Sequence, residues 1–116
     1  MPRTDRYPFR SDLRAKQIDV ASRGDTIGYL ELGAGRAMIG RYLYRIAHEE
    51  AVAGRPPLTS VVVRKGIGLP GEGFLEAMVW VKYIEEAAGQ DERSVWERAL
   101  RETYEYWRPK LRDDLK

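Results

Sequence analysis

The chain has 116 residues and a formal net charge of +2, and it contains no cysteine and a single histidine, His48. The length fits one domain, residues 1–116. The absence of cysteine excludes disulfides, thiolate nucleophiles and zinc–cysteine sites, and one histidine leaves a single imidazole for catalysis or metal binding. The sequence lacks the roughly 18 consecutive apolar residues of a membrane span and the apolar stretch of a signal peptide, so we expect a cytoplasmic protein.

The charges are distributed unevenly along the chain. Residues 36–65 hold six basic and two acidic side chains, whereas residues 84–105 hold seven acidic and three basic ones. This polarity is typical of a nucleic-acid-binding face opposite an acidic face, and ordinary charge scatter is the alternative. Asparagine is absent and arginine and glutamate are abundant, which suggests a thermophilic source.

The first two predicted elements are an extended arm and a helix. Residues 1–10 contain two prolines and show little periodicity, which predicts the arm. A helix is predicted over residues 11–22, with Ser11 or Asp12 as its N-cap and a glycine just after its end. A strand over residues 17–21 is the alternative for part of this segment.

Two helices joined by a glycine turn follow. A short helix is predicted over residues 26–32, with Asp25 or Thr26 as its cap, and a long helix over residues 36–53. Gly33 ends the first of them. The pair therefore forms a candidate helix-turn-helix.

The long helix is predicted to be amphipathic. Its apolar residues between Met38 and Ala47 recur at the spacing of one helical face, while Arg41, Arg45 and His48 lie on the opposite face. Arg36 stands in the first turn, where a recognition helix meets DNA.

The segment that follows carries the most distinctive pattern of the chain. Two prolines bar a helix, and the valines after them predict a buried strand over residues 58–63. A glycine-rich loop then turns the chain before a helix begins at Phe74, and its glycines are Gly66, Gly68, Gly71 and Gly73.

Two further helices are predicted in the last third of the chain. The first covers residues 74–88 and is apolar around most of its circumference, so it must be covered on two sides. Trp80 is the expected exposed anchor for a second copy or another protein. The second helix begins after its N-cap Asp91 and ends at Pro109, and residues 110–116 are expected to fray.

The glycine-rich loop is a candidate anion site. Gly66, Gly68 and Gly71 have the GxGxxG spacing of a dinucleotide-binding turn, but the sequence predicts two helices where that fold needs a second parallel strand. The backbone N–H groups of the loop and of the helix start, with Arg64 and Lys65, can still bind a nucleotide or a phosphate.

Neither a catalytic constellation nor a metal site is predicted. A metal-dependent nuclease needs an acid two residues before its lysine, and Val63 occupies that position before Lys65. We interpret Glu49 and Glu50 as the solvated end of the long helix, and His48 has no partner at a recognisable spacing. We therefore favour a protein that is not an enzyme and uses no cofactor and no metal.

One segment resembles a known DNA-binding domain. From Ile27 to Phe74, the order helix, glycine turn, long helix beginning GRAMIGRYL, prolines, valine strand and glycine-rich loop resembles the winged-helix domain of alkylguanine alkyltransferases and alkyltransferase-like proteins. Gly40 matches the glycine of that family's recognition helix, but Ala37 stands in place of its DNA-intercalating arginine. The family's proline-cysteine-histidine motif is absent, which excludes alkyl transfer.

A second resemblance is more local. The segment PPLTSVVVRKGIGLPGEGF is similar to one in small bacterial and phage proteins of unassigned function, some of which are joined to nuclease domains. This resemblance implies no activity and no site residue.

Together these patterns predict an α+β, mostly α fold, with a helix-turn-helix or winged-helix-like core, one strong strand and two C-terminal helices. The leading hypothesis is binding to DNA or association with another nucleic acid, through Arg36, Arg41, Arg45, Arg64 and Lys65. The alternatives are a homodimeric or accessory interaction module that uses Trp80, and nucleotide or phosphate binding at the glycine-rich loop.

Overall fold

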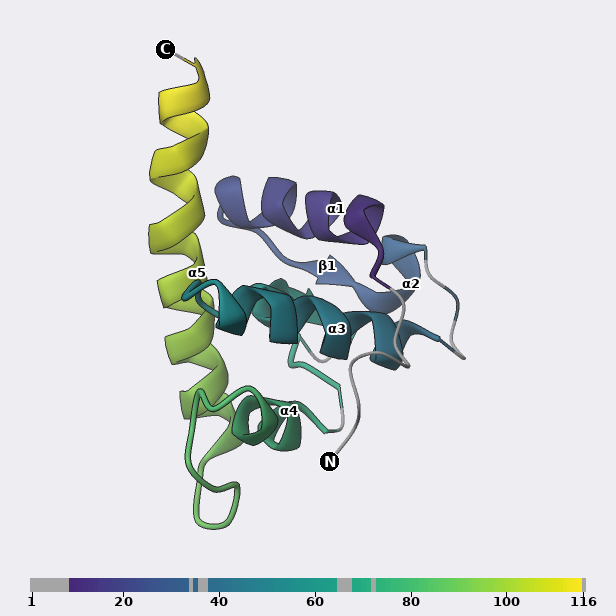
Figure 1. Cartoon of the computed structure of the whole chain (residues 1–116), viewed down its shortest axis with the longest axis vertical. Helices are drawn as coiled ribbons and strands as arrows, with labels where there is room; N and C mark the ends of the chain where they lie inside the picture. The colour runs from purple at the N-terminus through teal and green to yellow at the C-terminus, as the bar shows by residue number, and fades with distance from the viewer. Residues whose placement is uncertain (1–8, 34, 36–37, 65–67, 72, 116) are drawn as a thin grey trace.

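The structure, a computed structural model, describes residues 9–115 except 34, 36–37, 65–67 and 72, with side chains as far as residue 108. It has the predicted α+β, mostly helical fold (Figure 1). Its elements are α1 (Ser11–Ser22), β1 (Ile27–Gly28), α2 (Tyr29–Leu32), α3 (Ile39–Val52), the 3-10 helix η2 (Leu58–Val61), β2 (Val62–Val63), α4 (Phe74–Trp80) and α5 (Glu92–Leu115).

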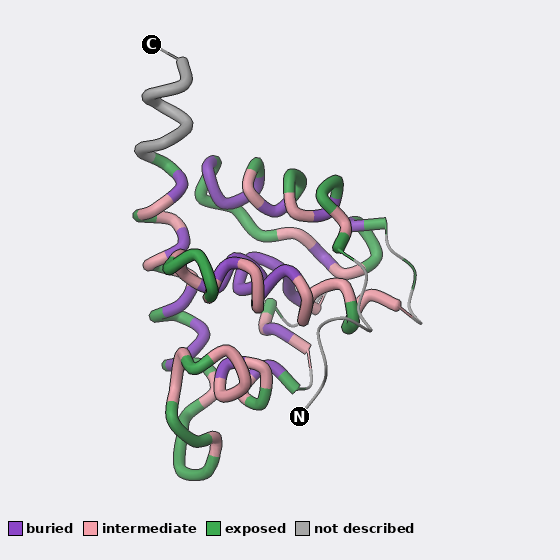
Figure 2. Tube along the Cα trace, in the orientation of Figure 1, coloured by how far each residue is buried: buried purple, intermediate pink, exposed green. Residues whose placement is uncertain are grey.

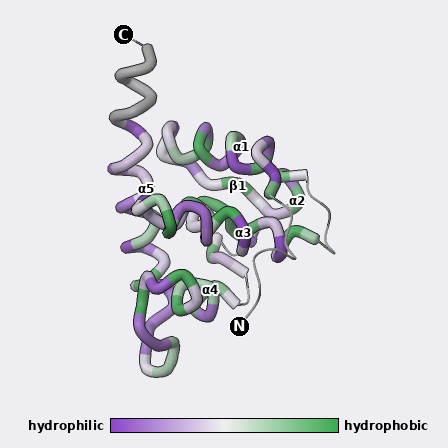
Figure 3. Tube along the Cα trace, viewed as in Figure 1, coloured by the Kyte–Doolittle hydropathy of each residue, from purple (hydrophilic) through white to green (hydrophobic). Residues whose placement is uncertain are grey.

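Two hydrophobic clusters form the core, and α5 contributes to both. One cluster joins α1, α3, η2 and the middle of α5, and it includes Leu13, Ile46 and Trp107. The other joins β2, α4 and the beginning of α5, and it includes Phe74 and Trp96. In Figures 1 and 2, α5 runs along one side of the molecule, and buried positions recur along its described part. Hydrophobic and hydrophilic residues accordingly interleave along α1, α3 and α5 (Figure 3).

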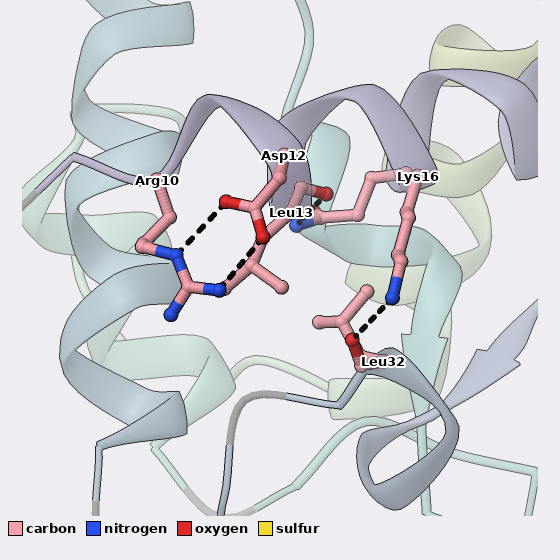
Figure 4. A network of polar contacts seen from close by, with 6 residues as sticks. Arg10, Asp12, Leu13, Lys16 and Leu32 are labelled. Atoms are coloured by element: carbon pink, nitrogen blue, oxygen red, sulfur yellow. Dashed lines mark hydrogen bonds and ion pairs between the residues drawn. The ribbon is translucent and has the colours of Figure 1, made fainter.

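The helix α1 has its predicted bounds but not its predicted N-cap. The N-cap is Arg10, which makes no side-chain capping bond, rather than Ser11 or Asp12. The guanidinium of Arg10 donates two hydrogen bonds to the Asp12 carboxylate, at 2.8 and 2.7 Å (Figure 4). The carboxylate is therefore engaged by a side chain instead of capping the helix. Gly24 ends the helix with a left-handed φ of +70°, the conformation that favours glycine.

The prediction of a helix over residues 26–32 is wrong at its beginning. Ile27 and Gly28 form β1, which pairs in parallel with β2 so that Ile27 lies opposite Val62. Only the four residues of α2 are helical, and Lys16 Nζ of α1 donates to the last carbonyl of α2 at 3.2 Å (Figure 4). The pairing with β2 thus takes priority over local helix formation at this point.

The predicted strand over residues 58–63 is wrong for its first four residues, which form η2. Side chains of α5 hold this turn. Trp96 Nε1 donates to Ser60 O at 2.8 Å, and Thr103 Oγ1 donates to Pro57 O at 3.0 Å. These bonds satisfy carbonyl groups that a strand would pair with a neighbouring strand. Only the last two valines pair, in β2, and both are buried as predicted.

The helix α3 begins at Ile39 rather than at residue 36, and residues 36 and 37 lie outside the described residues. It ends as predicted, before Gly54 with its φ of +75°. The winged-helix part of the fold stays a prediction, because the glycine-rich loop that would form the wing lies partly outside the described residues. The strands β1 and β2 pair in parallel and do not form a wing.

The predicted helix over residues 74–88 is wrong beyond α4. The chain leaves α4 in a Schellman turn, in which Tyr83 N donates to Met78 O at 2.8 Å and Lys82 adopts a left-handed φ of +65°. The Tyr83 hydroxyl then donates to Glu102 of α5 at 2.5 Å. The turn therefore places Tyr83 against α5 instead of continuing the helix into solvent.

The helix α5 begins as predicted, because Ser94 N donates to the Asp91 carboxylate at 3.2 Å. It continues through Pro109 to Leu115, so the predicted end at Pro109 is wrong, and the fraying of residues 110–116 stays a prediction. A proline removes one backbone hydrogen bond, and here that loss does not end the helix. Neither α5 nor any other helix among the described residues is long and apolar enough to cross a membrane.

Candidate functional site

A cleft of about 1020 Å³ lies between α3 and α4, and we call it the α3–α4 cleft. The two helices supply most of its apolar wall, and the segments around β1 and the glycine-rich loop close one end. Its lining residues are Tyr29, Ile39, Gly40, Leu43, Tyr44, Ala47, Thr59, Arg64, Gly71, Gly73, Phe74 and Ala77.

Arg64 and Tyr29 form the polar end of the α3–α4 cleft. Arg64 Nε donates to Pro70 O at 3.2 Å, and its Nη1 and Nη2 have no partner among the described residues. The Tyr29 hydroxyl accepts a hydrogen bond from Gly71 N at 2.7 Å. Burial raises the pKa of Tyr29, against the opposing effects of the Gly71 N–H and the Arg64 charge. The hydroxyl is therefore neutral at physiological pH and keeps a proton to donate.

The glycine-rich loop brings Gly71 and Gly73 into the cleft, whereas Gly68 does not line it and Gly66 lies outside the described residues. A Cβ atom at Gly71 would lie 2.7 Å from the Tyr29 hydroxyl oxygen, so the contact requires glycine. Because the Gly71 N–H already donates to Tyr29, it is not free to bind an anion as predicted. Arg64 and Tyr29 are the described side-chain donors at this end of the cleft.

Three of the five basic residues predicted to bind nucleic acid are described. Arg36 and Lys65 lie outside the described residues. Arg64 lines the cleft, and Arg41 is exposed on α3 beside Gly40, which also lines it. Within the described part of the chain, Arg41 forms no ion pair, and its Nη1 lies 4.0 Å from the sulfur of Met38. Of the three described residues, Arg64 is the one that lines the cleft, because Arg41 lies on another side of α3 from Leu43 and Ala47.

Arg45 has a different environment. Its Nε donates to the Glu49 carboxylate at 2.8 Å, and its guanidinium lies 5.9 Å from the ring centroid of Phe9. The guanidinium of Arg10 lies 5.0 Å from the ring centroid of Tyr42, one turn away on the same helix. This side of α3 is therefore covered in part by the segment that precedes α1.

Trp80, the predicted partner anchor, packs within the chain and is half-buried. Its ring lies 5.1 Å from the ring of Tyr44 in an edge-on contact and 5.5 Å from the ring of His48 in a stacked contact, both measured between centroids. His48 thus faces α4 rather than lying with the arginines, which the helical pattern did not indicate. These three rings extend the aromatic surface beside the α3–α4 cleft.

Sequence reasoning also missed a buried ion cluster. Glu50, predicted to be solvated, is completely buried. Its carboxylate accepts from Arg14 Nε of α1 at 2.5 Å and from Arg55 Nε beyond α3. Arg14 lies 36 residues before Glu50 in the sequence, and Arg55 lies 5 residues after it. Because Arg14 is so far away in the sequence, no local pattern indicated the cluster. This cluster fixes α1 to α3 and lies outside the lining of the cleft.

Within the described residues, no group of three or more histidine, cysteine, aspartate or glutamate side chains could hold a metal ion. No family model, no curated protein and no solved structure matches this chain. The resemblances to alkyltransferase-like proteins and to the small bacterial and phage proteins therefore stay predictions.

Proposed function

We propose that this protein binds nucleic acid, with a strand lying along the α3–α4 cleft and a phosphate group on Arg64. The observation that carries the proposal is the Arg64 guanidinium, which lines a cleft and has two nitrogen atoms without a partner among the described residues. A half-buried cation without a counter-ion gains from an anionic ligand, and a guanidinium matches phosphate geometry in a bidentate manner.

A single strand suits this site better than a duplex. Nonspecific single-strand binding combines a basic groove with aromatic and apolar surface for the bases, and the cleft offers both kinds of side chain. A duplex read by α3 as a recognition helix would use Arg45, which is paired with Glu49 and partly covered by Phe9. Binding of a duplex by α3 as the recognition helix of a helix-turn-helix is the alternative, and the binding experiment also tests it.

Fluorescence anisotropy of labelled single-stranded and duplex DNA over a salt series tests the proposal. We expect the single strand to bind more tightly, with the logarithm of the association constant falling linearly with the logarithm of the salt concentration. Arg64→Ala should weaken binding by about tenfold or more, because a charge-assisted hydrogen bond is lost.

Arg101→Ala is the matched control, because Arg101 is an exposed arginine of α5 that does not line the cleft. It should change the affinity by less than about twofold at physiological salt, where distant charges are screened. Equal losses in the two variants, or no binding at low salt, would contradict the proposal. Tighter binding of the duplex would favour reading by α3.

A further inference from the structure

We infer that the α3–α4 cleft holds one unstacked nucleobase, so that the ligand class is a strand with unpaired bases rather than a phosphate backbone alone. This inference rests on the proposed function and concerns the same site. It depends on the volume of the cleft, on the presence of both polar and apolar lining residues, and on the missing side chain at Gly40.

The volume of the cleft exceeds what a phosphate group needs. At about 1020 Å³, it lies at the upper end of the pockets that enclose small organic ligands, which measure roughly 300–1000 Å³. A phosphate bound to Arg64 would leave most of this space to water. A whole nucleotide, with its base inside, fits a cleft of this size.

The apolar part of the lining is suited to the faces of a base. It consists mainly of Leu43 and Ala47 of α3 and Phe74 and Ala77 of α4. Their apolar surface gains free energy when a planar aromatic ring replaces water against it. A backbone phosphate would find no hydrogen-bond donor in these four side chains.

The polar end fixes the orientation of the nucleotide. The Arg64 nitrogen atoms Nη1 and Nη2, which have no partner among the described residues, suit two phosphate oxygens. The Tyr29 hydroxyl, which accepts from Gly71, can donate its proton to an acceptor on the sugar or the base edge. Both groups are polar and lie near Gly71, so we place the phosphate on Arg64 and the base against the apolar residues of α3 and α4.

Gly40 offers a matched pair of variants for the test. It lines the cleft from within α3, and a Cβ atom added there would have no heavy atom within 4 Å. Both Gly40→Ala and Gly40→Trp are compatible with the helix, because glycine is a poorer helix former than either replacement. Alanine leaves the cleft open, whereas tryptophan fills it.

The experiment compares the affinity for a single-stranded oligothymidylate with that for an oligomer of the same length that carries no bases. We expect the unmodified protein and Gly40→Ala to bind the base-bearing strand roughly tenfold or more tightly, which is the effect of stacking one base. In Gly40→Trp this preference should fall to about one, because the loss of affinity falls on the base-bearing strand more than on the abasic strand.

The outcomes separate the inference from the proposed function. Equal affinities of the unmodified protein for the two strands would overturn the inference while phosphate binding stands. A full preference for bases in a folded Gly40→Trp would also overturn it, since the base would then lie elsewhere. Failure of both strands to bind at low salt would overturn the proposed function itself. If Gly40→Trp does not fold, Ala77→Phe fills the cleft from α4 and takes its place in the comparison.

Discussion

At the scale of single residues, the charge of Glu50 illustrates how a buried ion is tolerated. The carboxylate has no exposure to water and is bound by Arg14 and Arg55, both of which are partly exposed. Burying one charge is costly unless its partners stay in hydrogen-bond contact. Removal of Glu50 would leave two guanidinium groups without their shared acceptor.

We expect Glu50→Ala to lower the free energy of unfolding by about 3–5 kcal/mol, the cost of breaking a buried ion pair. Glu49→Ala is the control, because Glu49 is partly exposed and pairs with Arg45 one turn away on the same helix. It should cost no more than about 0.5 kcal/mol. Urea unfolding measures the free energy of unfolding of both variants. Similar losses would show that the buried cluster stabilises the fold no more than the exposed pair does.

The carboxyl of Asp12 gives a prediction about pH. The hydrogen bonds from Arg10 lower the pKa of Asp12 from 3.8 to about 2. Because the folded-state pKa lies below the unfolded one, the contribution of this pair to stability is present above about pH 3.8 and is lost as the pH falls toward 2.

NMR titration of the Asp12 carboxyl should therefore give a midpoint near pH 2 in the unmodified protein. In Arg10→Ala the midpoint should return toward the ordinary value of 3.8, because the donor of both hydrogen bonds is gone. A midpoint that does not move would assign the low pKa to the backbone N–H groups at the start of α1 instead.

At the scale of secondary structure, the ends of several elements could be predicted because glycine marks them. Gly24, Gly33 and Gly54 adopt left-handed φ values where the pattern places helix ends, and Asp91 caps α5 as expected. The end of α4 could not be predicted, because Lys82 takes the same conformation without glycine. Tertiary contacts with α5 set that end.

Lys82→Gly should accordingly raise the free energy of unfolding by about 0.5–1 kcal/mol. A non-glycine residue is strained at a φ of +65°, and relief of this strain exceeds the entropy that glycine adds to the unfolded chain. In urea unfolding, the midpoint concentration should rise, while the slope of the unfolding free energy against urea concentration (the m-value) should stay unchanged.

Gly89→Ala is the reverse substitution and serves as the control, because Gly89 has a φ of +77° and an added Cβ would meet no atom within 4 Å. It should lower stability by a similar amount, because alanine meets only backbone strain there. A stabilising effect of Gly89→Ala would contradict this explanation of both sites.

The predicted valine strand shows the same limit of local patterns. Three consecutive valines favour a strand, yet Trp96 and Thr103 bind the carbonyls of Ser60 and Pro57 and hold a 3-10 turn. These donors lie 36 and 46 residues later in the chain. Propensity therefore predicted the burial of this segment correctly and its backbone conformation only in part.

At the scale of the whole molecule, the α3–α4 cleft combines parts that differ in how readily the sequence indicates them. Arg64 and the glycines of the loop could be singled out because a basic residue and several closely spaced glycines occur in one short segment of the sequence. Tyr29 could not, because a tyrosine within an apolar stretch is typical of a core residue. Its role depends on Gly71, which lies 42 residues away. The site could thus be predicted as a segment but not as a cleft.

The position of α5 has a consequence for how the chain reaches its native state. The Tyr104 hydroxyl of α5 donates to Asp25 O at 2.8 Å, across 79 residues of sequence, and α1 packs against the same helix. Contacts of such high sequence separation form slowly, because the entropy of closing a long loop is lost before the contacts contribute any favourable free energy. During synthesis, α3 and η2 can cover part of the apolar side of α1, but the part that α5 covers stays exposed until most of α5 has left the ribosome. Over that interval the nascent chain is open to chaperones and to aggregation.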